Sequence, residues 1–372
     1  MMTDLKITVY RKDFIRLGWI GIPETVGGTI IFNLAGEISV TVAEDHPQAE
    51  NLLVEGNRLV IEGYGLSIPL MSGPIIKVDA GRAAGAANSI TVTIRDDLMH
   101  IYGLVGWPKP TAGIAAQTDA YRTYTGSAEK IVKDVVRENA LRAGLPLTVA
   151  PNLNRGSTIA GGIPFRFHPL QDKLIPSIEQ AGLGMRCYQV SGGLRFDVYE
   201  PATYPIALSE EAGTLLSYSY SRSAPVVTRV VSGGQGEGAS RALAERIDTS
   251  LEALWGFTLE GFVDARDSDD PIEIDTRVKD LLAEGSAKEG LSVQLAETEH
   301  FGYHRAPVGT RVSIKTPGAT ITDIIRSATI SYTTDSGLVT DPQVGDLEDT
   351  PALKQAKLTR GLRKALNALQ RR

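Results

Sequence analysis

Short runs in which apolar and polar residues strictly alternate dominate the first hundred residues of the chain. Residues 37–42 read Glu-Ile-Ser-Val-Thr-Val, and the same alternation recurs at 5–10 and at 90–94. Successive side chains of a β-strand point to opposite faces, so this pattern predicts strands with one buried and one exposed face. The N-terminal part of the chain is therefore expected to form a small β-barrel or sandwich.

The rest of the chain mixes helical and strand patterns. At 372 residues it exceeds the usual size of a single core, so several domains are expected. A helical pattern that places Ile131, Val135, Val136 and Leu141 on one face and ends at Gly144, with a glycine-turn hairpin around 191–193, predicts an α/β module. Farther along the chain, residues 255–263 are expected to be extended. The fold class is therefore α+β, mainly β. The expected domains are a first barrel (1–113), an α/β domain (114–205), a second barrel (206–245 with 300–340), an inserted α/β domain (246–299) and a C-terminal segment (341–372).

The C-terminal segment differs from the body in charge. Residues 351–372 contain seven basic residues and no acidic one, although the whole chain has a net charge of −6. Four leucines recur at helical spacing, and an isolated helix of this length is marginal in water. The sequence thus predicts an amphipathic helix that docks on a partner surface. The candidate partner-binding residues are Leu358, Leu362, Leu366, Leu369, Arg363 and Lys364.

A glycine-rich run, VVSGGQGEGAS at 230–240, resembles a phosphate-binding loop at first sight. Gly233, Gly238 and Ser240 have the spacing of such a loop, but Ala239 stands where the phosphate-binding lysine is needed. Glu237 would place a carboxylate against phosphate oxygens. The run is therefore interpreted as a turn after a strand, with glycines supplying positive φ or close backbone approach.

Other polar groups give weak signals for chemistry. His300 and His304 are four residues apart, but Gly302 between them and a following proline disfavour the helix that would bring both onto one metal. The adjacent Asp96 and Asp97 would point to opposite faces of a strand, which argues against a catalytic pair.

A cluster of aspartates also resembles the start of a calcium loop, without its glycine and glutamate. One of these aspartates is interpreted instead as the cap of a helix that begins near Pro271. The cluster consists of Asp264, Asp267, Asp269 and Asp270.

Cysteine content and hydropathy limit the class of protein further. Cys187 is the only cysteine, which excludes an intrachain disulfide and a thiolate zinc site. No apolar run reaches the length of a membrane span, and the first residues lack the pattern of a signal peptide. The acidic body argues against nucleic-acid binding. We expect a protein made in the cytoplasm, without cofactor, metal or enzymatic activity.

The order of these features resembles a known family. SYSRSAP followed by VVSGGQGEG, and the later FVDARDSDD, together look like the siphophage minor tail proteins of actinobacteriophages, over about residues 3–345. The resemblance implies a phage tail-hub fold, in which two tail-tube-like β-barrels carry peripheral α/β modules. A faint echo between SITVTIRDD and ATISYTTDS agrees with two related barrels.

The resemblance also implies a function. Members of this family are baseplate or tail-tip hub proteins, so a homotrimer is expected to adapt the sixfold tail tube to a threefold tip and to surround the channel for genome ejection. The implied partners are the distal tail protein, other tail-tip proteins and the tape-measure protein, and the implied location is the virion. The alternatives are a tail-associated cell-wall hydrolase and a receptor- or carbohydrate-binding tail protein.

Overall fold

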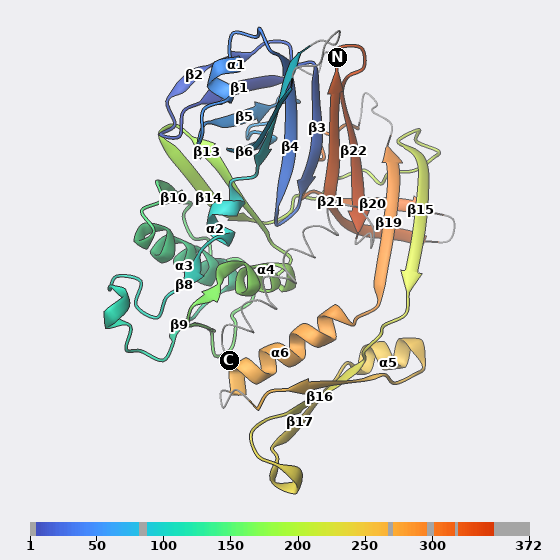
Figure 1. The fold of residues 1–372 in the computed structure, drawn as a ribbon. Helices are drawn as coiled ribbons and strands as arrows, with labels where there is room; N and C mark the ends of the chain where they lie inside the picture. Colours follow the sequence, from blue (N-terminus) through green and yellow to red (C-terminus); the bar gives the residue numbers. More distant parts are fainter. Residues whose placement is uncertain (1–4, 82–87, 267–270, 296–300, 317–318, 346–372) are drawn as a thin grey trace. The chain divides into compact units, whose positions relative to one another are not determined.

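The computed structural model describes residues 5–81, 88–266, 271–295, 301–316 and 319–345 (Figure 1). The chain divides by residue contacts into two units. Unit 1 comprises Met1–Tyr218 with Val293–Arg372, and unit 2 comprises Ser219–Ser292. The mainly β, α+β class expected from the sequence is confirmed. The division of the chain into two barrels, a peripheral α/β domain and an inserted α/β domain stays a prediction.

Most strands of unit 1 belong to a large sheet of twelve strands, in which β15 and β19 run across the chain boundaries between the two units. Its order is β15-β19-β22-β21-β3-β4-β7-β6-β5-β1-β2, with β20 paired to β21 outside this path. The strands are β1 (Lys6–Tyr10), β2 (Arg16–Ile20), β3 (Thr25–Ile31), β4 (Leu34–Ala43), β5 (Arg58–Glu62), β6 (Met71–Gly81), β7 (Ser89–Arg95), β15 (Leu215–Ser223), β19 (Lys288–Leu295), β20 (Arg311–Thr316), β21 (Ala319–Thr333) and β22 (Gly337–Gly345). A short helix, α1 (Ala49–Leu52), lies between β4 and β5 in the chain.

The alternating sequence pattern builds the core of this sheet. Ile38 and Val40 of β4 are fully buried, as are Val92 and Ile94 of β7. The polar residues between them lie on the other face, where they are half-buried. Strands from both ends of the chain share this core, because Ile330 of β21 belongs to the same apolar cluster.

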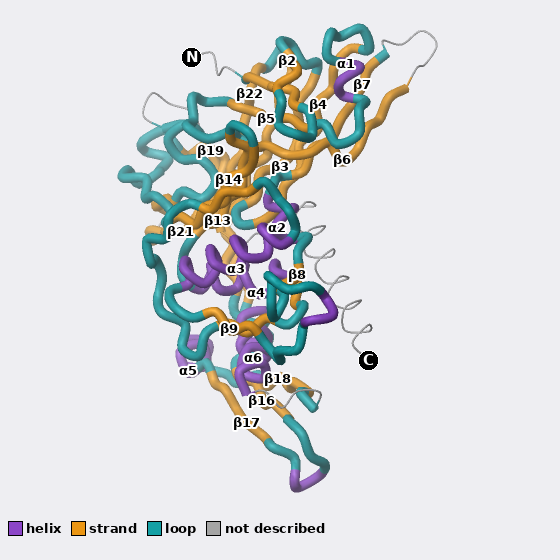
Figure 2. Tube along the Cα trace, turned by 90° about the vertical axis from the view of Figure 1, so that its left-hand side faces the viewer, coloured by secondary structure: helices purple, strands orange, loops and turns teal. Residues whose placement is uncertain are grey.

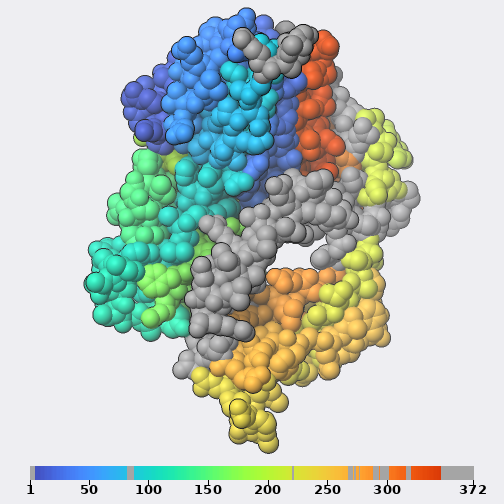
Figure 3. Space-filling model, viewed as in Figure 1, coloured from blue at the N-terminus to red at the C-terminus, as the bar shows by residue number. Residues whose placement is uncertain are grey.

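Pairing between β3 and β21 joins the N-terminal and C-terminal parts of the sheet. The antiparallel ladder runs from Thr25 opposite Thr333 to Ile31 opposite Ser327. On its other side β3 pairs with β4, so β3 is enclosed between an early and a late strand of the chain. In Figure 3 the red surface of the C-terminal strands accordingly adjoins the blue surface of the N-terminal strands.

An α/β module follows β7 in the chain and also belongs to unit 1. Helices α2, α3 and α4 lie together and pack with the β13–β14 hairpin around a second apolar core (Figures 1 and 2). The helices are α2 (Leu98–Tyr102), α3 (Ala128–Arg142) and α4 (Leu170–Gln180). The strands are β8 (Val105–Gly106), β9 (Arg122–Tyr124), β10 (Leu147–Val149), β11 (Ile163–Phe165), β12 (His168–Pro169), β13 (Gly184–Val190) and β14 (Gly193–Tyr199).

Local signals explain the bounds of α3. The Ser127 hydroxyl accepts a hydrogen bond from the backbone N–H of Lys130 at 3.3 Å, which caps the first turn. Gly144, with φ +68°, follows the last turn, as the sequence predicted. One prediction for this helix is wrong. Leu141 was placed on the buried face, but it is 77 % exposed. In the last turns of α3 the buried face is formed by Val136 and Ala140, and Leu141 lies outside it.

Buried polar contacts fasten the module to the large sheet. Arg58 of β5 donates to both carboxylate oxygens of Asp97, at 2.6 and 2.7 Å, and to the amide oxygen of Gln189 in β13 at 2.6 Å. Ser72 of β6 donates to Asp97 at 2.6 Å and accepts from the backbone N–H of Gln189 at 2.8 Å. These side chains are almost inaccessible, so each depends on the others for its hydrogen bonds.

Unit 2 contains a small three-stranded sheet and two helices. Strand β16 (Arg229–Gly233) is the central strand, antiparallel to β17 (Leu243–Ile247) and parallel to β18 (Glu260–Asp264). Helix α5 (Thr249–Trp255) follows β17, and α6 (Pro271–Glu284) packs against β16 and β18. Residues 255–263 were expected to be extended. Strand β18 confirms this from Glu260 on, but Trp255 ends α5, because the Asp248 carboxylate caps that helix and Gly256 ends it in the left-handed region.

We predict that the Arg58–Asp97 contact is a main determinant of the stability of unit 1. Arg58→Met would leave the Asp97 carboxylate buried without its cation, which typically costs about 3–5 kcal/mol. Chemical denaturation followed by far-UV circular dichroism would measure the loss.

Lys6→Met is the matched control, because both side chains of the Lys6–Glu62 ion pair are exposed to solvent. Such pairs contribute about 0–1 kcal/mol. Equal effects of the two variants on the free energy of unfolding would contradict the assignment.

Candidate functional site

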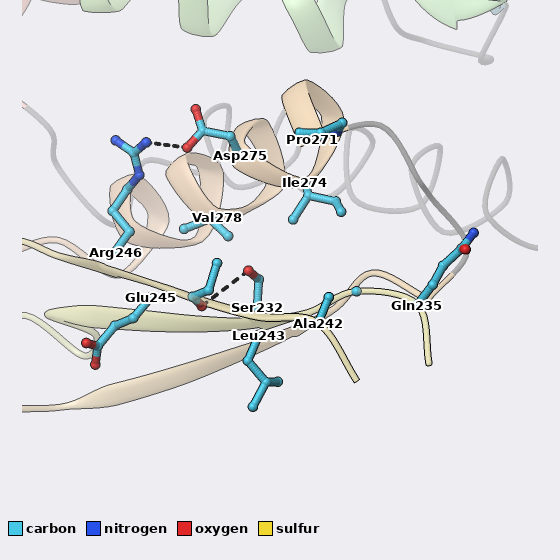
Figure 4. Close-up of a pocket in the computed structure, with 12 residues that line it drawn as sticks. Ser232, Gln235, Ala242, Leu243, Glu245, Arg246, Pro271, Ile274, Asp275 and Val278 are labelled. Carbon is cyan, nitrogen blue, oxygen red and sulfur yellow. Dashed lines mark hydrogen bonds and ion pairs between the residues drawn. The ribbon is translucent and has the colours of Figure 1, made fainter. Parts of the chain in front are cut away.

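Unit 2 contains a groove of about 550 Å³ between the three-stranded sheet and the first half of α6 (Figure 4). Ile274 and Val278, one helical turn apart on α6, point down toward the sheet. The opposite wall is the strand β17 with the residue before it. Its lining residues are Ser232, Gly234, Gln235, Ala242, Leu243, Ala244, Glu245, Arg246, Pro271, Ile274, Asp275 and Val278.

The two faces of the small sheet differ. Val230 and Ser232 of β16 are buried on the α6 side. Leu243 of β17 points away from α6 in Figure 4 and is 66 % exposed. Phe262 of β18, 55 % exposed, lies on the same outer face as Leu243, since both are in register with outward residues of β16. The groove therefore lies on the face of the sheet on which α6 packs, along the edge strand β17, whose residues are exposed.

Few polar groups of the groove are available to a ligand. Arg246 and Asp275 form an ion pair across one end, and the Ser232 hydroxyl donates to the backbone carbonyl of Ala244 at 3.3 Å. Alanine, isoleucine, valine and proline side chains supply most of the remaining lining. Within the described residues, the groove is thus suited to apolar side chains rather than to a small polar ligand.

The glycine-rich run forms one end of this groove. It connects β16 to β17 as a hairpin loop that includes a 3-10 turn, Gly238–Ser240. Arg241 donates to the carbonyl oxygens of Gly233 at 2.9 Å and Gly234 at 3.2 Å, so these carbonyls face a cation already present in the chain. Gly236 has φ +103°, as the interpretation as a turn requires. A phosphate-binding loop would instead direct its N–H groups toward the ligand.

Asp264, the only described member of the acidic cluster, lies next to this loop. Asp264 accepts hydrogen bonds from Arg266 and, at 2.7 Å, from Arg241. Arg266 first, and Arg241 with it, lowers the pKa of Asp264 to about 2. The negative charge of Asp264, which a calcium ion would need as a ligand, is therefore already neutralised by two guanidinium groups. Asp267, Asp269 and Asp270 lie outside the described residues.

The remaining predicted positions do not converge. His304 accepts a hydrogen bond from Arg305 at 3.0 Å, and His300 lies outside the described residues. Asp96 accepts from the backbone N–H of Leu98, whereas Asp97 binds Arg58, so the two carboxylates have separate partners. Burial raises the pKa of both.

The rest of the described part of the chain offers no metal site either. No three histidine, cysteine, aspartate or glutamate residues are grouped there as metal ligands would be. None of its helices has the length and apolar character to cross a membrane.

The predicted partner-binding residues of the C-terminal segment cannot be placed. Leu358, Leu362, Leu366, Leu369, Arg363 and Lys364 all lie outside the described residues. Their role in docking stays a prediction.

A second candidate surface lies on the large sheet of unit 1. Its polar face carries three rows of residues that cross β21, β3, β4 and β7 in register. We call these rows the hydroxyl face. They are Thr333-Thr25-Thr41-Thr91, Ser331-Gly27-Ser39-Thr93 and Thr329-Thr29-Glu37-Arg95.

Nine of the twelve positions of the hydroxyl face carry a hydroxyl group. Ser39 and Thr93 share a hydrogen bond of 2.9 Å, and Thr41 and Thr91 share another. The only charges in the three rows, Glu37 and Arg95, neutralise each other in an ion pair. The rows continue onto β6 with Lys77 and Asp79, which form an ion pair, and onto β22 with Asp341, so the face is polar and most of its charges are paired.

Sequence reasoning missed both surfaces. The alternation identified several of the strands, but it did not show that their outward positions come into register, since that depends on the pairing of β3 with β21. A serine or threonine at every second position of 39–41, 89–93 and 329–333, and at both ends of 25–29, was the available signal.

We predict that backbone strain at the glycine loop makes Gly236 essential to the hairpin. A Cβ there would lie 2.6 Å from the carbonyl oxygen of Ser240, and φ +103° is unfavourable for any other residue. Gly236→Ala should destabilise the β16–β17 hairpin by about 3 kcal/mol or more, the upper end of the usual cost of such strain. Hydrogen exchange of the β16 and β17 amides would measure it.

Gly238→Ala is the matched control, because its φ is +53° and no atom lies within 4 Å of the added Cβ. Its cost should be about 1–2 kcal/mol, that of a left-handed residue alone. If exchange rates in the two variants rose equally, the close approach at Gly236 would not matter.

Comparison with solved structures identifies the fold. The prophage MuSo2 43 kDa tail protein from Shewanella oneidensis aligns with a TM-score of 0.59 at 11% identity, over 92% of this chain and 100% of that chain. The tail protein from Neisseria meningitidis MC58 gives a TM-score of 0.55 at 12% identity, over 92% and 96%. Prophage tail protein gp18 from Listeria monocytogenes EGD-e gives 0.54 at 12%, over 96% and 99%. The chain therefore has the fold of these tail proteins.

Comparison at the level of sequence identifies the family. No curated protein matches the sequence. The family model described as Siphovirus ReqiPepy6 Gp37-like protein matches residues 6–346, which is nearly the whole chain. The resemblance to siphophage tail proteins expected from the SYSRSAP and FVDARDSDD blocks is thereby confirmed. The chain belongs to the family of siphovirus ReqiPepy6 Gp37-like proteins.

Proposed function

We propose that this protein is a structural hub of a siphophage tail tip, in which several copies surround the channel through which the genome leaves. The observation that carries this proposal is the hydroxyl face. It crosses strands from both ends of the chain, so one protein presents a continuous polar wall. The family membership and the likeness to prophage tail proteins support the same role.

The chemistry of the hydroxyl face suits the wall of a channel for DNA. Proteins that hold DNA neutralise its phosphates with lysine and arginine. Here the single arginine, Arg95, is already paired with Glu37, and the other polar side chains are hydroxyls, which both donate and accept hydrogen bonds. Such a wall stays hydrated and offers a passing polyanion neither a strong attraction nor a strong repulsion.

The two halves of the sheet support a threefold arrangement. One half consists of β1–β7 from the N-terminal region, and the other contains β20, β21 and β22 from the C-terminal region. Three copies would therefore place six sheet halves around one axis, which is the adaptation from a sixfold tube to a threefold tip. Closed rotational symmetry is the usual solution for soluble homo-oligomers. The partners in this proposal are the distal tail protein, other tail-tip proteins and the tape-measure protein inside the channel.

We predict that the hydroxyl face is shielded in assembled tails. In Thr329→Cys the new thiol lies on this face, at an exposed position of the isolated chain. A large polyethylene-glycol maleimide should therefore modify the isolated variant but not the same variant in purified tails. The native Cys187 is buried, and burial raises the pKa of its thiol, so it contributes little background.

Thr111→Cys provides the matched control, since Thr111 is exposed in the α/β module, away from the sheet. It should react in both the isolated chain and the tail. Equal modification of Thr329→Cys in the two states would show that the hydroxyl face points outward, and the channel role would be wrong.

We also predict three copies of the protein per virion. A reconstruction of the tail tip should show a ring with threefold symmetry whose asymmetric unit is one chain. A ring of six chains, or a single chain at the periphery of the tail, would contradict the threefold arrangement. Isolated protein is a weaker test, because neighbouring tail proteins stabilise such a ring by mass action.

A further inference from the structure

Another hollow lies within unit 1, where the large sheet meets the α/β module. Its volume is about 390 Å³, which is in the range of pockets that hold small organic molecules. The loop between β5 and β6 lines one side, the β13–β14 hairpin another, and the segment before β20 a third. We call this hollow the Asp96 pocket, after the residue that follows β7 and belongs to its lining.

Most side chains that line the Asp96 pocket are apolar. Met71, Met185 and Tyr303 are almost fully buried, so the surrounding structure holds them in place. The ring of Tyr303 also packs against the ring of Tyr64, with 5.2 Å between the two centroids. Walls of this kind favour a ligand with an apolar body.

Asp96 adds a negative charge to these apolar walls. Its carboxylate accepts a hydrogen bond from the backbone N–H of Leu98 at 2.7 Å, and within the described ranges no cation pairs with it. Burial raises the pKa of Asp96 well above its usual value, and the neighbouring Asp97 adds to this effect. A cation that enters the pocket would therefore stabilise the ionised carboxylate.

The other charges near Asp96 already have partners. Asp97 is paired with Arg58 at 2.6 Å. Arg186 is the basic residue of the described lining, and it binds Asp197 at 3.1 Å. The negative charge left over in this part of unit 1 is therefore that of Asp96.

An organic cation suits the Asp96 pocket better than a metal ion does. Calcium and magnesium require about six oxygen ligands or more. The described part of the chain contains no group of three acidic, histidine or cysteine residues that could supply them. An ammonium group on an apolar chain instead needs one carboxylate and apolar walls, which are what this pocket offers.

We propose that the Asp96 pocket binds an alkylammonium group, with the charge at Asp96 and the apolar chain against Met71 and Met185. An ammonium group donates hydrogen bonds and accepts none, so it complements a carboxylate. A free organic amine and the lysine side chain of a neighbouring protein share this chemistry. The proposal does not depend on the channel role or on the threefold arrangement.

Titration of the full-length chain with n-hexylamine tests the proposal. Met71 and Met185 line the pocket, whereas Met99 of α2 does not belong to the lining. With carbon-13 in the methionine methyl groups, the nuclear magnetic resonance signals of Met71 and Met185 should shift, and that of Met99 should stay in place. The titration is made at about pH 8, where an alkylamine, like a lysine with its pKa of about 10.4, is still charged.

1-Hexanol is the matched control ligand, because it has the same chain without the charge. It should need a concentration about tenfold higher or more to produce the same shifts, since a hydrogen bond to a charged group is stronger than one between neutral groups. Equal affinity for the two compounds would overturn the proposal, and so would unchanged Met71 and Met185 signals. This comparison uses the unaltered protein, so it does not depend on the folding of a variant.

Asp96→Asn tests the carboxylate itself. The amide oxygen of asparagine can still accept the hydrogen bond from Leu98, so the variant removes the charge and keeps the contact. Its affinity for n-hexylamine should fall about tenfold or more, whereas its affinity for 1-hexanol should stay the same. Glu200→Gln is the control, because Glu200 is an exposed carboxylate of the same lining. Equal losses in the two variants would mean that surface charge attracts the amine, and the assignment to Asp96 would be wrong.

A photoreactive alkylamine distinguishes the two sources of the ammonium group. In the isolated chain it should label peptides that contain Met71 or Met185, and labelling confined to other peptides would contradict the proposal. Labelling that persists in purified tails would identify a free amine as the ligand. Labelling that is lost there would show that a lysine of a neighbouring tail protein fills the pocket.

Discussion

The pairing of β3 with β21 is the contact on which the large sheet depends. It is the ladder that joins the strands from the start of the chain to those from its end, and the apolar core of the sheet includes residues from both. The hydroxyl face exists for the same reason, because its rows become continuous only when Thr29 lies beside Thr329. A change that weakened this ladder would therefore affect the core and the polar wall together.

Buried polar contacts then fix the α/β module to that sheet. Besides the Arg58–Asp97 contact, Asn33 at the β3–β4 turn is buried with φ +57°. Its side chain accepts from the backbone N–H of Met185 at 2.7 Å and donates to the carbonyl of Leu183 at 3.3 Å, while its backbone carbonyl accepts from Tyr102. Directional contacts of this kind hold one arrangement of the two layers, which apolar packing alone specifies less strictly.

The sequence predicted local structure well and long-range structure poorly. Alternation identified the strands at 37–42 and 90–94, and helical periodicity with the glycine that follows it identified α3, because these patterns depend on neighbouring residues. The exposure of Leu141 and the helix ending at Trp255 could not be foreseen from periodicity, since partners distant in the chain decide which face is buried. The groove in unit 2 could not be predicted from the sequence for a similar reason. Its walls, near Ala244 and Ile274, come from two separate segments of the chain. The glycine-rich run at one end of the groove resembled a phosphate-binding loop and gave no sign of the groove.

The long separation of β3 and β21 also affects how the protein is made. About 300 residues separate the paired strands, so at about 5–20 residues per second a ribosome adds β21 roughly 15–60 s after β3. Throughout that interval one edge of β3 has no partner, and an open edge invites pairing with other nascent chains. Gly27 and Gly28 lie in the middle of this strand, and glycine is a poor residue for propagating a β-sheet. Gly28 is also required in the finished fold, where a Cβ would lie 2.2 Å from the carbonyl oxygen of Glu37. Gly28, which permits close pairing in the mature sheet, thus also lowers, together with Gly27, the risk of aggregation during translation.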